Sequence, residues 1–380
     1  MPPSPPDTEP MRRGEVSHWW ARLGGPPPPR PALRGQVRAD VCIVGAGYTG
    51  LWTAWYLTQA APGLRVTIVE RDFAGFGASG RNGGWLTGGF AWAHDRYLTT
   101  GDAAGVRALV RAMEGTVDEV IAVARAEGIA ADIHRTDELM VATNPAQLAR
   151  ARAEVAHRQA WGETRITLMG PEALAARIAI PGALGALAVG GVARVQPAAL
   201  VAGLAAAVER RGVTIHEGSP ATALHPGRVD TPGGQVLAPV VIRATEGFTP
   251  TLPGLRRDWL PLNSAQVVTE PLPAAVWVRI GWHRAELLGD MAHAYFYAQR
   301  TADGRIALGG RGVPYRYGSA LDEAGAPDPV TVDSLVARLR AVFPAAAGAR
   351  IDHAWCGVLA VPRDWCATVG FDPATGLGWA

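Results

Sequence analysis

The chain has 380 residues and a hydrophobic fraction of 48%, enough to bury a sizeable core and to suggest about two domains. Its formal net charge of +2 comes from charges scattered along the chain, so it lacks the basic patch that marks a nucleic-acid-binding protein. All 36 basic side chains are arginines, which excludes mechanisms that need a lysine, such as Schiff-base catalysis or a Walker-type phosphate site.

The cysteines and the hydropathy of the chain limit which cellular compartment and which kinds of site are expected. The cysteines Cys42, Cys356 and Cys366 have neither CxxC spacing nor an even count, so we expect no disulfide framework, no metal site and a reducing cytoplasm. The N-terminal residues lack the apolar segment of a signal peptide. The longest uncharged run, residues 178–193, is interrupted by Pro181 and is too short to cross a membrane.

A proline-rich N-terminal arm opens the chain. Residues 1–35 contain two proline clusters, one of them reading GGPPPPRP, which favour an extended segment over a packed element. Trp19 and Trp20 are the side chains expected to anchor this arm to the body of the protein. The first packed domain is therefore expected to begin after it.

A βαβ unit follows the arm. The stretch ADVCIVGAGYTGLWTAWYL passes from an apolar strand through glycines into a helix, and RVTIVE forms a second buried strand that ends at Glu70. Gly45, Gly47 and Gly50 make the GxGxxG pattern, which permits a tight turn, a close approach to pyrophosphate and close packing of helix on strand. Glu70, twenty residues after Gly50, can accept hydrogen bonds from ribose hydroxyls. The unit predicts a dinucleotide site rather than a simple glycine-rich turn.

A second glycine-rich stretch distinguishes between the two common dinucleotides. Residues 76–90 read FGASGRNGGWLTGGF, and six of these fifteen residues are glycine. Glycine lowers stability unless the backbone must turn sharply or approach a neighbour closely. An NAD-binding domain would continue with alternating strands and helices, so this run favours FAD. A plain NAD-binding Rossmann protein is the less favoured alternative.

The middle of the chain mixes helical and strand patterns. Apolar residues at helical spacing predict two amphipathic helices, within residues 103–128 and 145–161, packed outside the first sheet. A strand is expected between them, at residues 137–144. A helix and two strands within residues 196–247 then resume the nucleotide-binding sheet.

The C-terminal part reads as antiparallel strands followed by a helix. Residues 260–310 carry strand patterns, and Asp303 and Gly304 form a hairpin signal between two of them. A last helix is expected within residues 328–344.

Three quoted motifs carry a family resemblance. DVCIVGAGYTGLWTAWYL, VTIVE and GASGRNGG together resemble the N-terminal signature of the FAD-dependent D-amino-acid oxidase superfamily, most closely its gamma-glutamylputrescine oxidoreductase-like branch. The resemblance continues through RTADGRIALGGRG and VPRDWCATVGFDPATGLGWA, so it covers nearly all of residues 36–380. It implies an α/β fold, α+β overall, with a Rossmann-like FAD-binding domain and a discontinuous substrate domain of antiparallel sheet and helices. The FAD-binding domain would comprise residues 36–95, 168–248 and 345–380, and the substrate domain residues 96–167 and 249–344.

The resemblance also implies which residues bind FAD. Residues 79–84 would pass along the flavin, with Ser79, Arg81 and Asn82 hydrogen-bonding it and the glycines allowing close approach; the alternative is a glycine-rich surface turn with a solvated arginine. Arg71 is interpreted as a solvated neighbour or an adenine-edge contact. The full expected set is Gly45, Gly47, Tyr48, Thr49, Gly50, Glu70, Arg71, Ser79, Gly80, Arg81, Asn82, Gly83, Gly84, Ala221, Ala244 and Thr245.

The activity that the resemblance implies is oxidation of an amine or amino acid. A hydride leaves the carbon beside a neutral amine nitrogen, and water hydrolyses the resulting imine to a carbonyl and a free amine. No catalytic acid or base is assigned. The substrate-pocket candidates Tyr295, Tyr297 and Gln299 alternate onto one face of a predicted strand. Arg300, on the other face, is the nearest match to the carboxylate-binding arginine of amino-acid oxidases, although an aromatic strand packing its own sheet explains the pattern equally well.

Three departures from the resembled family bear on the chemistry. Members of the sarcosine-oxidase type use a lysine near the flavin for reaction with oxygen, so here the electron acceptor is either O2, with another group in that role, or a different acceptor. Aligning Pro362 with a conserved proline puts Cys356 where some members attach FAD covalently, against the alternative of a small buried hydrophobe. Relatives continue beyond TGLGWA into a segment that closes over the flavin, so a flavin-binding protein without turnover is the alternative function.

Overall fold

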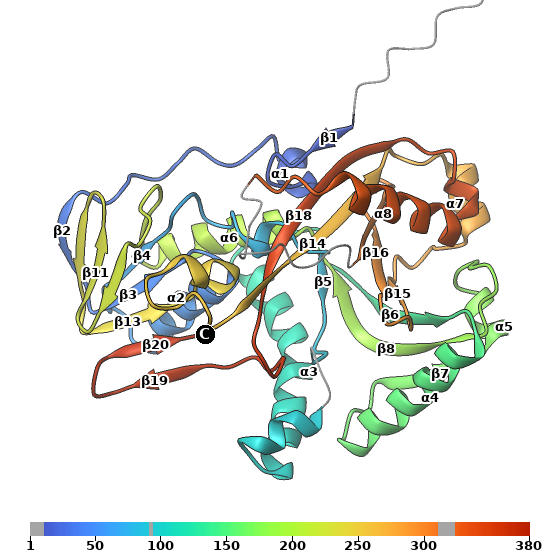
Figure 1. Ribbon diagram of the computed structural model, residues 1–380, viewed down its shortest axis with the longest axis horizontal. Coiled ribbons are helices and arrows are strands. Elements are labelled where there is room, and N and C mark those ends of the chain that lie inside the picture. The colour runs from blue at the N-terminus through green and yellow to red at the C-terminus, as the bar shows by residue number, and fades with distance from the viewer. Residues whose placement is uncertain (1–10, 91–93, 311–323) are drawn as a thin grey trace, which may run out of the picture.

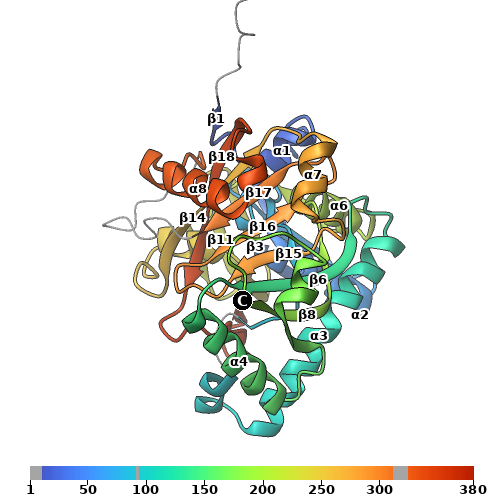
Figure 2. The ribbon, with the colours of Figure 1, turned by 90° about the vertical axis from the view of Figure 1, so that its right-hand side faces the viewer.

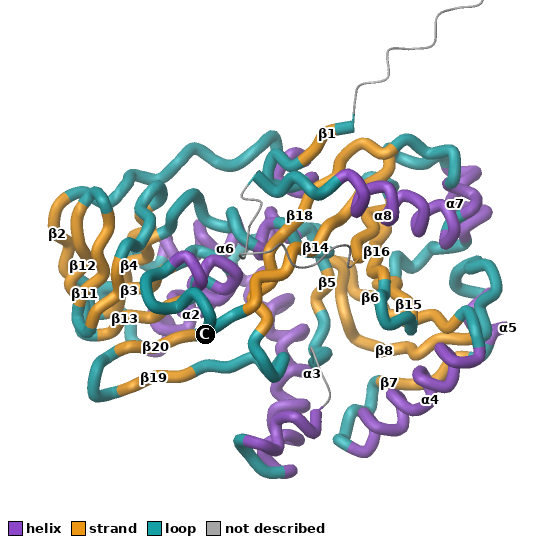
Figure 3. The backbone as a smooth tube through the Cα atoms, viewed as in Figure 1, coloured by secondary structure: helices purple, strands orange, loops and turns teal. Residues whose placement is uncertain are grey.

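The computed structural model describes residues 11–90, 94–310 and 324–380 of the chain (Figure 1). These residues form three sheets with helices packed around them, which confirms the expected mixed α/β fold. The two smaller sheets lie together at one end of the molecule and the largest sheet lies beside them (Figure 3). Within the described ranges, no helix is long and apolar enough to cross a membrane.

The first small sheet is the predicted nucleotide-binding sheet. Its strand order is β19-β20-β13-β3-β4-β9, and every pair except β19 with β20 is parallel. Helices α2 (Tyr48–Ala60) and α6 (Pro197–Arg210) cover one face through an apolar cluster that includes Leu51, Ala54 and Leu204. The strands are β3 (Val41–Val44), β4 (Val66–Val69), β9 (Thr214–His216), β13 (Val240–Arg243), β19 (Gly370–Asp372) and β20 (Leu377–Trp379).

A four-stranded sheet covers the other face of the nucleotide-binding sheet. Its order is β10-β11-β12-β2, and Val229 and Val236 pack against Cys42 and Val241 across the interface. With both faces covered, β3 and β4 are wholly buried, which accounts for their continuous apolar sequences. The strands are β2 (Gly35–Arg38), β10 (Ala223–His225), β11 (Arg228–Thr231) and β12 (Gly234–Leu237).

The large sheet has ten strands. Its order is β1-β18-β14-β17-β16-β15-β6-β8-β5, with β7 paired to β8. The predicted hairpin is present, since β16 and β17 pair antiparallel on either side of Asp303 and Gly304. The strands are β1 (Arg12–Arg13), β5 (Trp85–Leu86), β6 (His134–Ala142), β7 (Ile166–Met169), β8 (Gly185–Arg194), β14 (Leu260–Thr269), β15 (Leu287–Asp290), β16 (Phe296–Arg300), β17 (Ile306–Gly310) and β18 (Ile351–Val361).

The two faces of the large sheet have different neighbours. One face carries Phe296, Leu308 and Cys356, which pack into an apolar core with Leu335 of helix α8 (Pro329–Val342). The other face, here called the loop side, presents Tyr297, Gln299, Gln266 and Trp355 to the glycine-rich residues that precede β5. The alternation of side chains along each strand separates these two environments.

The remaining helices surround the sheets. Helix α3 (Ala103–Ala126) packs against α2 and α6, as expected, with Val120, Val123 and Ala124 on its buried side. Helix α4 (Pro145–Ala160) differs from expectation, because Ala151 and Val155 pack on β7 and β8 of the large sheet. Figures 1 and 2 show both helices extending from the same side of the molecule. The shorter helices are α1 (His18–Arg22), α5 (Pro171–Ala175), α7 (Ala274–Ile280) and the 3-10 turns Ala78–Gly80, His94–Thr99, Glu246–Thr251 and Pro344–Ala346.

Strand pairing bears on the division into domains. Strands β8 and β18 fall within the ranges 168–248 and 345–380, which the sequence assigns to the FAD-binding domain, yet both pair within the large sheet. Their apolar patterns fit either sheet, and long-range pairing decides which one they join. The N-terminal arm is also more closely packed than an extended segment, because Trp19 and Trp20 are buried and β1 pairs with β18.

Candidate cofactor and substrate site

The GxGxxG turn lies where backbone segments cross too closely for any side chain. A Cβ on Gly45 would collide with the carbonyl oxygen of Ala244, and a Cβ on Gly50 would collide with the carbonyl oxygen of Gly45. Gly45 also has φ of +107°, a conformation that favours glycine. The turn therefore brings the start of α2 against the ends of β3 and β13.

The N-terminus of α2 faces a cleft of about 370 Å³. Gly47 caps the helix without a side-chain hydrogen bond, and the Tyr48 N–H donates to Ser79 Oγ at 2.8 Å. A helix start without a charged cap offers backbone N–H groups and a positive partial charge to an anion. A dinucleotide pyrophosphate fits this position.

Glu70 stands at the end of β4 on the same cleft. Its carboxylate accepts hydrogen bonds from the Ala46 N–H at 2.7 Å and from the Asp72 N–H at 3.1 Å. Burial raises the pKa of the carboxyl group. Each carboxylate oxygen has a further lone pair, so the group keeps the capacity to accept ribose hydroxyls.

Most of the expected FAD-binding residues line this cleft. Arg71 lies at its edge with its guanidinium 4.6 Å from the centre of the Phe248 ring, and it donates to Asp72. Gly50 lies beneath the cleft, where α2 packs against β3. The expected residues on the cleft wall are Gly45, Gly47, Tyr48, Thr49, Glu70, Arg71, Ser79, Ala221, Ala244 and Thr245.

Glu246, which follows Ala244 and Thr245, is a further cleft residue. Its carboxylate accepts from the Ala360 N–H at 2.8 Å, and its φ is +40°, which is uncommon for a residue other than glycine. The resemblance implies that residues 244–247, at the end of the β13 strand, pass near the phosphates, and Glu246 is one of them. Glu246 thus connects the nucleotide-binding sheet to β18.

The side chains of Arg81 and Asn82 are held by the protein itself. Arg81 is 2% exposed, and its guanidinium donates to Phe76 O at 2.7 Å and to Cys356 O at 3.2 Å. Asn82 donates to Ser79 O at 2.9 Å and accepts from the Gly84 N–H at 2.8 Å. These contacts shape residues 79–84, here called the flavin loop, and any direct contact of the two side chains with flavin stays a prediction.

The three glycines of the flavin loop lie close to side chains from distant parts of the sequence. A Cβ on Gly80 would collide with the indole of Trp20 and the carbonyl oxygen of Gly75, and a Cβ on Gly84 with the amide of Gln299 and the carbonyl oxygen of Val195. A Cβ on Gly83 would come within 2.8 Å of the Tyr297 ring. The glycines that the sequence linked to flavin thus also allow close packing on the arm and on the large sheet.

Tyr297 and Gln299 lie on the loop side of the large sheet, as a pocket role requires. The Tyr297 hydroxyl is 3.0 Å from Ser264 Oγ, and the ring meets Trp85 edge-on. Burial raises the pKa of Tyr297 to about 12, so its hydroxyl stays protonated at neutral pH. Tyr295 precedes the first residue of β16.

Arg300 and Cys356 lie on the opposite side of the large sheet. The Arg300 guanidinium donates to Trp282 O at 2.7 Å and lies 4.1 Å from the centre of the Trp277 ring. The Cys356 sulfur belongs to the apolar core under α8. A substrate or flavin on the loop side would not meet either group, and the carboxylate clamp and the covalent tether stay untested predictions.

Known proteins are similar to this chain in sequence and in fold. The sequence profile of the family described as FAD dependent oxidoreductase matches residues 40–379. Over 348 residues the chain is 30% identical to Gamma-glutamylputrescine oxidoreductase of Escherichia coli K12, covering 90% of this chain and 78% of that protein. The fold is similar to L-proline dehydrogenase from P. horikoshii, with a TM-score of 0.74, 18% identity and coverage of 92% of this chain and 88% of that chain. It is also similar to glycine oxidase from Geobacillus kaustophilus, with a TM-score of 0.71, 20% identity and coverage of 90% and 89%.

Proposed function

The chain belongs to the FAD dependent oxidoreductase family, and we propose that it oxidises the carbon–nitrogen bond of a small amine or amino acid. The family membership expected from the motifs is confirmed, and FAD is the cofactor of that family. The substrate class follows the names of the similar proteins, which act on gamma-glutamylputrescine, L-proline and glycine.

The cleft residues provide a binding site of the right kind for FAD. Glu70 would hold ribose hydroxyls, and the N–H groups at the start of α2 would hold the pyrophosphate. Ala221 would line the adenine end, and the flavin loop would direct the flavin towards the large sheet. Bound flavin supplies the hydride acceptor for amine oxidation.

One observation carries the proposal: the Tyr297 ring packs between the flavin loop, at Gly83, and the adjacent strand β17, at Gly309. A Cβ on Gly83 would meet one edge of its ring, and a Cβ on Gly309 would overlap the ring from the adjacent strand. The strand bearing the candidate pocket residues thus contacts the loop expected to run along the flavin. A substrate held against Tyr297 would lie beside that loop.

The proposed amine oxidation requires little proton transfer by these residues. An amine loses a hydride readily only when its nitrogen is neutral, so a desolvated site assists by disfavouring the ammonium form. The hydroxyls of Tyr297 and Ser264 can accept a hydrogen bond from the amine and fix its orientation. Water then hydrolyses the imine product to a carbonyl compound and a free amine.

The electron acceptor and the setting of the reaction complete the proposal. Reduced flavin is reoxidised by O2, with a group other than lysine assisting, or by a separate acceptor. The cytoplasmic location and the absence of a nucleic-acid partner, expected from the cysteine spacing and scattered charges, belong to the same proposal.

Flavin binding is tested first, by adding FAD to the purified protein. We expect absorbance bands at roughly 370 and 450 nm that stay with the protein through gel filtration. Glu70→Gln should raise the Kd for FAD about tenfold, because it removes a charged acceptor. Glu209→Gln is the matched control, since Glu209 pairs with Arg30 outside the cleft. Equal Kd values for both variants would contradict the cleft assignment.

Turnover is tested by anaerobic mixing of the FAD-loaded protein with gamma-glutamylputrescine, putrescine, L-proline and glycine. We expect at least one to bleach the band near roughly 450 nm and to yield a carbonyl product. Bleaching by dithionite but by none of the four amines would count against amine oxidation while leaving flavin binding intact. The rate of colour return on mixing with air then measures whether O2 is an efficient acceptor.

A further inference from the structure

The backbone carbonyls of the flavin loop are hydrogen-bonded one after another by donors from elsewhere in the chain. The donors come from α1 and its N-cap, from the loop side of the large sheet and from the residue that directly follows β8. Five bonds, one to each carbonyl, are Ser17 Oγ to Gly80 O at 2.7 Å, Trp355 Nε1 to Arg81 O at 2.9 Å, Trp19 Nε1 to Asn82 O at 2.8 Å, Gln299 Nε2 to Gly83 O at 2.6 Å and Val195 N to Gly84 O at 2.9 Å. Arg81 O also accepts a hydrogen bond from Gln266 Nε2 at 2.5 Å.

Two of these five bonds come from the N-terminal arm. Ser17 is fully buried and Trp19 is 3% exposed, so both donors act away from water, where an unpaired group would be costly. Trp20, the next residue, packs its indole against Gly80. The arm therefore holds the flavin loop through two hydrogen bonds and one packing contact.

Fixing a carbonyl also fixes the N–H on the same peptide unit. In a trans peptide the C=O and the following N–H point in opposite directions, so the bond from Trp19 to Asn82 O sets the direction of the Gly83 N–H. Within the described ranges the Gly83 N–H makes no hydrogen bond, although its neighbours at Asn82 and Gly84 do. It is a donor oriented by the arm and left available to a ligand.

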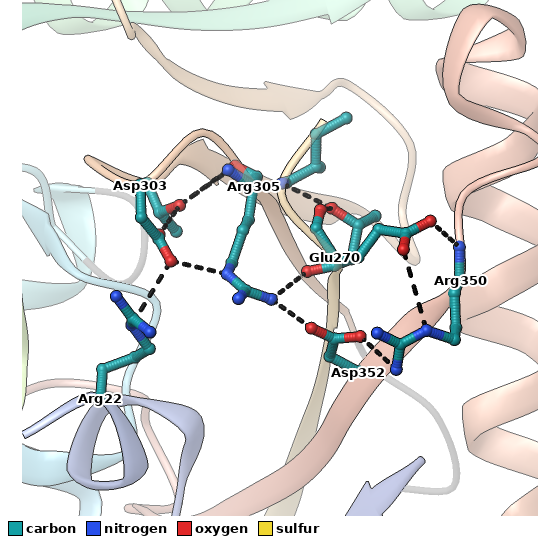
Figure 4. Close-up of polar contacts among 9 residues, drawn as sticks. Arg22, Glu270, Asp303, Arg305, Arg350 and Asp352 are labelled. Atoms are coloured by element: carbon teal, nitrogen blue, oxygen red, sulfur yellow. Dashed lines mark hydrogen bonds and ion pairs between the residues drawn. The ribbon is translucent and has the colours of Figure 1, made fainter. Parts of the chain in front are cut away.

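The arm is itself anchored to the hairpin that carries Tyr297 and Gln299. Arg22, in α1, lies 3.3 Å from Asp303 at the hairpin turn, and Asp303 pairs with Arg305 at 2.7 Å (Figure 4). Figure 4 shows the chain of ion pairs continuing from Arg305 through Asp352 to Arg350 and Glu270. The arm thus contacts both the flavin loop and the substrate-side hairpin.

The anchoring continues along the backbone of the arm. The Gly14 N–H donates to Ala354 O at 2.9 Å, and the Gly14 carbonyl lies 2.8 Å from the ring nitrogen of His353, both on β18. Gln196 donates to Trp19 O at 2.9 Å. With its ends held on β18 and on the hairpin, the segment between them has a fixed position over the flavin loop.

We infer that residues 11–23 of the N-terminal arm are a positioning element, in which Ser17 and Trp19 align the flavin loop for the cofactor. The inference rests on the proposed flavin site. Ser17 and Trp19 act through the backbone of Gly80 and Asn82 and are positioning residues, because they need not touch the flavin. If the arm only stabilised the fold, losing one of these bonds would change neither the alignment of the flavin loop nor the affinity for flavin.

The test compares two indole-to-phenyl substitutions. Trp19→Phe removes the donor to Asn82 O and keeps an aromatic ring. Trp55→Phe is the matched control, because Trp55, within α2, is 5% exposed and donates to Glu127 at 2.9 Å, outside the flavin loop. We expect Trp19→Phe to raise the Kd for FAD about fivefold and Trp55→Phe to leave it unchanged, with similar losses of Tm.

Hydrogen exchange in the protein without FAD provides a readout independent of turnover. Trp19→Phe should speed exchange of the amides in residues 80–85 severalfold relative to Trp55→Phe. Ser17→Ala, which removes the donor to Gly80 O, should act in the same direction and serves if Trp19→Phe folds poorly. Unchanged exchange and unchanged Kd in both arm variants would overturn the inference. Absence of amine oxidation in the wild type would overturn only the proposed function.

Discussion

The two glycine-rich regions of the molecule need glycine for different reasons. In the GxGxxG turn, the atoms that exclude a Cβ are backbone oxygens: that of Gly45, five residues before Gly50, and that of Ala244, which is far from Gly45 in sequence and follows the adjacent strand β13. In the flavin loop, Gly80 and Gly84 are close both to side chains, Trp20 and Gln299, and to backbone oxygens, whereas a Cβ on Gly83 would collide only with the side chain of Tyr297, far away in sequence. The contact at Gly50 is therefore local and made by backbone, whereas the contact at Gly83 is long-range and made by a side chain. Substitutions in the two regions should therefore respond differently to changes in their partners.

Gly50→Ala should have the largest effect. The added Cβ meets a backbone oxygen that has no room to move, so we expect a loss of about 3 kcal/mol in the free energy of unfolding and loss of FAD binding. Urea unfolding and flavin titration measure both. Gly115→Ala is the control: Gly115 lies on an exposed part of α3 with nothing within 4 Å of a Cβ, and should gain about 0.5–1 kcal/mol. A Gly50→Ala variant as stable as the wild type would refute the backbone-contact explanation.

Gly83→Ala should cost less and should depend on its partner. The Cβ would meet only the Tyr297 ring, so we expect a loss of about 1–3 kcal/mol. In the Tyr297→Ala background most of this cost should disappear, giving a coupling energy above about 1 kcal/mol in a double-mutant cycle. For Gly50→Ala, the matched background Ile43→Ala removes the nearby side-chain atom but should give little coupling, because the contact with the Gly45 carbonyl oxygen remains. Equal coupling energies in the two double-mutant cycles would contradict the distinction between the two glycine-rich regions.

Acidification should affect the N-terminal arm, which contacts the flavin loop, and the GxGxxG cleft in opposite directions. Burial, together with the nearby Arg305 and His353, lowers the pKa of His18 to about 3. The unfolded chain then binds a proton that the folded chain does not, so stability falls as pH drops below about 6.5. Between pH 6.5 and 5.5 the loss is about 1 kcal/mol. The raised pKa of Glu70, beside the GxGxxG turn, makes the folded chain the better proton binder and has the opposite sign.

Unfolding measured against pH checks this contribution. His18→Gln should flatten the curve between about pH 6.5 and 5.5 relative to the wild type. His353, whose pKa burial also lowers, should keep part of the slope. Identical slopes in the variant and the wild type would show that His18 is not the titrating group.

Arg22→Ala should have the smallest effect. The Arg22 side chain is 52% exposed, and its contact with Asp303 is an ion pair screened by water. We expect a loss below about 0.5 kcal/mol and no change in the Kd for FAD. A larger rise in that Kd than Trp19→Phe produces would mean that the ion pair, rather than the indole hydrogen bond, positions the flavin loop.

The sequence predicted the local parts of this arrangement well. The strand–turn–helix with Glu70, the helix α6, the hairpin at Asp303 and the last helix follow from patterns within short windows, and all are present. The part of the cleft wall formed by GxGxxG could be predicted from local geometry, whereas Ala221, Ala244 and Thr245 were implied by the family resemblance.

Long-range contacts account for the differences. Strands β8 and β18 joined the large sheet, and no pattern within either strand specifies its partner. Arg300 faces Trp277 and Trp282 because residue alternation on β16 puts it opposite Tyr297, and the sequence left the choice of face open. The contacts of Ser17 and Trp19 with the flavin loop cross more than sixty residues of sequence, and a buried Trp pair was their only signal.

A structure of the protein with FAD bound tests the central claim most directly. We predict that the ribose hydroxyls lie within hydrogen-bonding distance of Glu70, that the pyrophosphate lies at the start of α2, and that the flavin ring lies beside the flavin loop, on the loop side of the large sheet. A ribose away from Glu70, or a flavin ring on the side of the large sheet that faces α8, would contradict it.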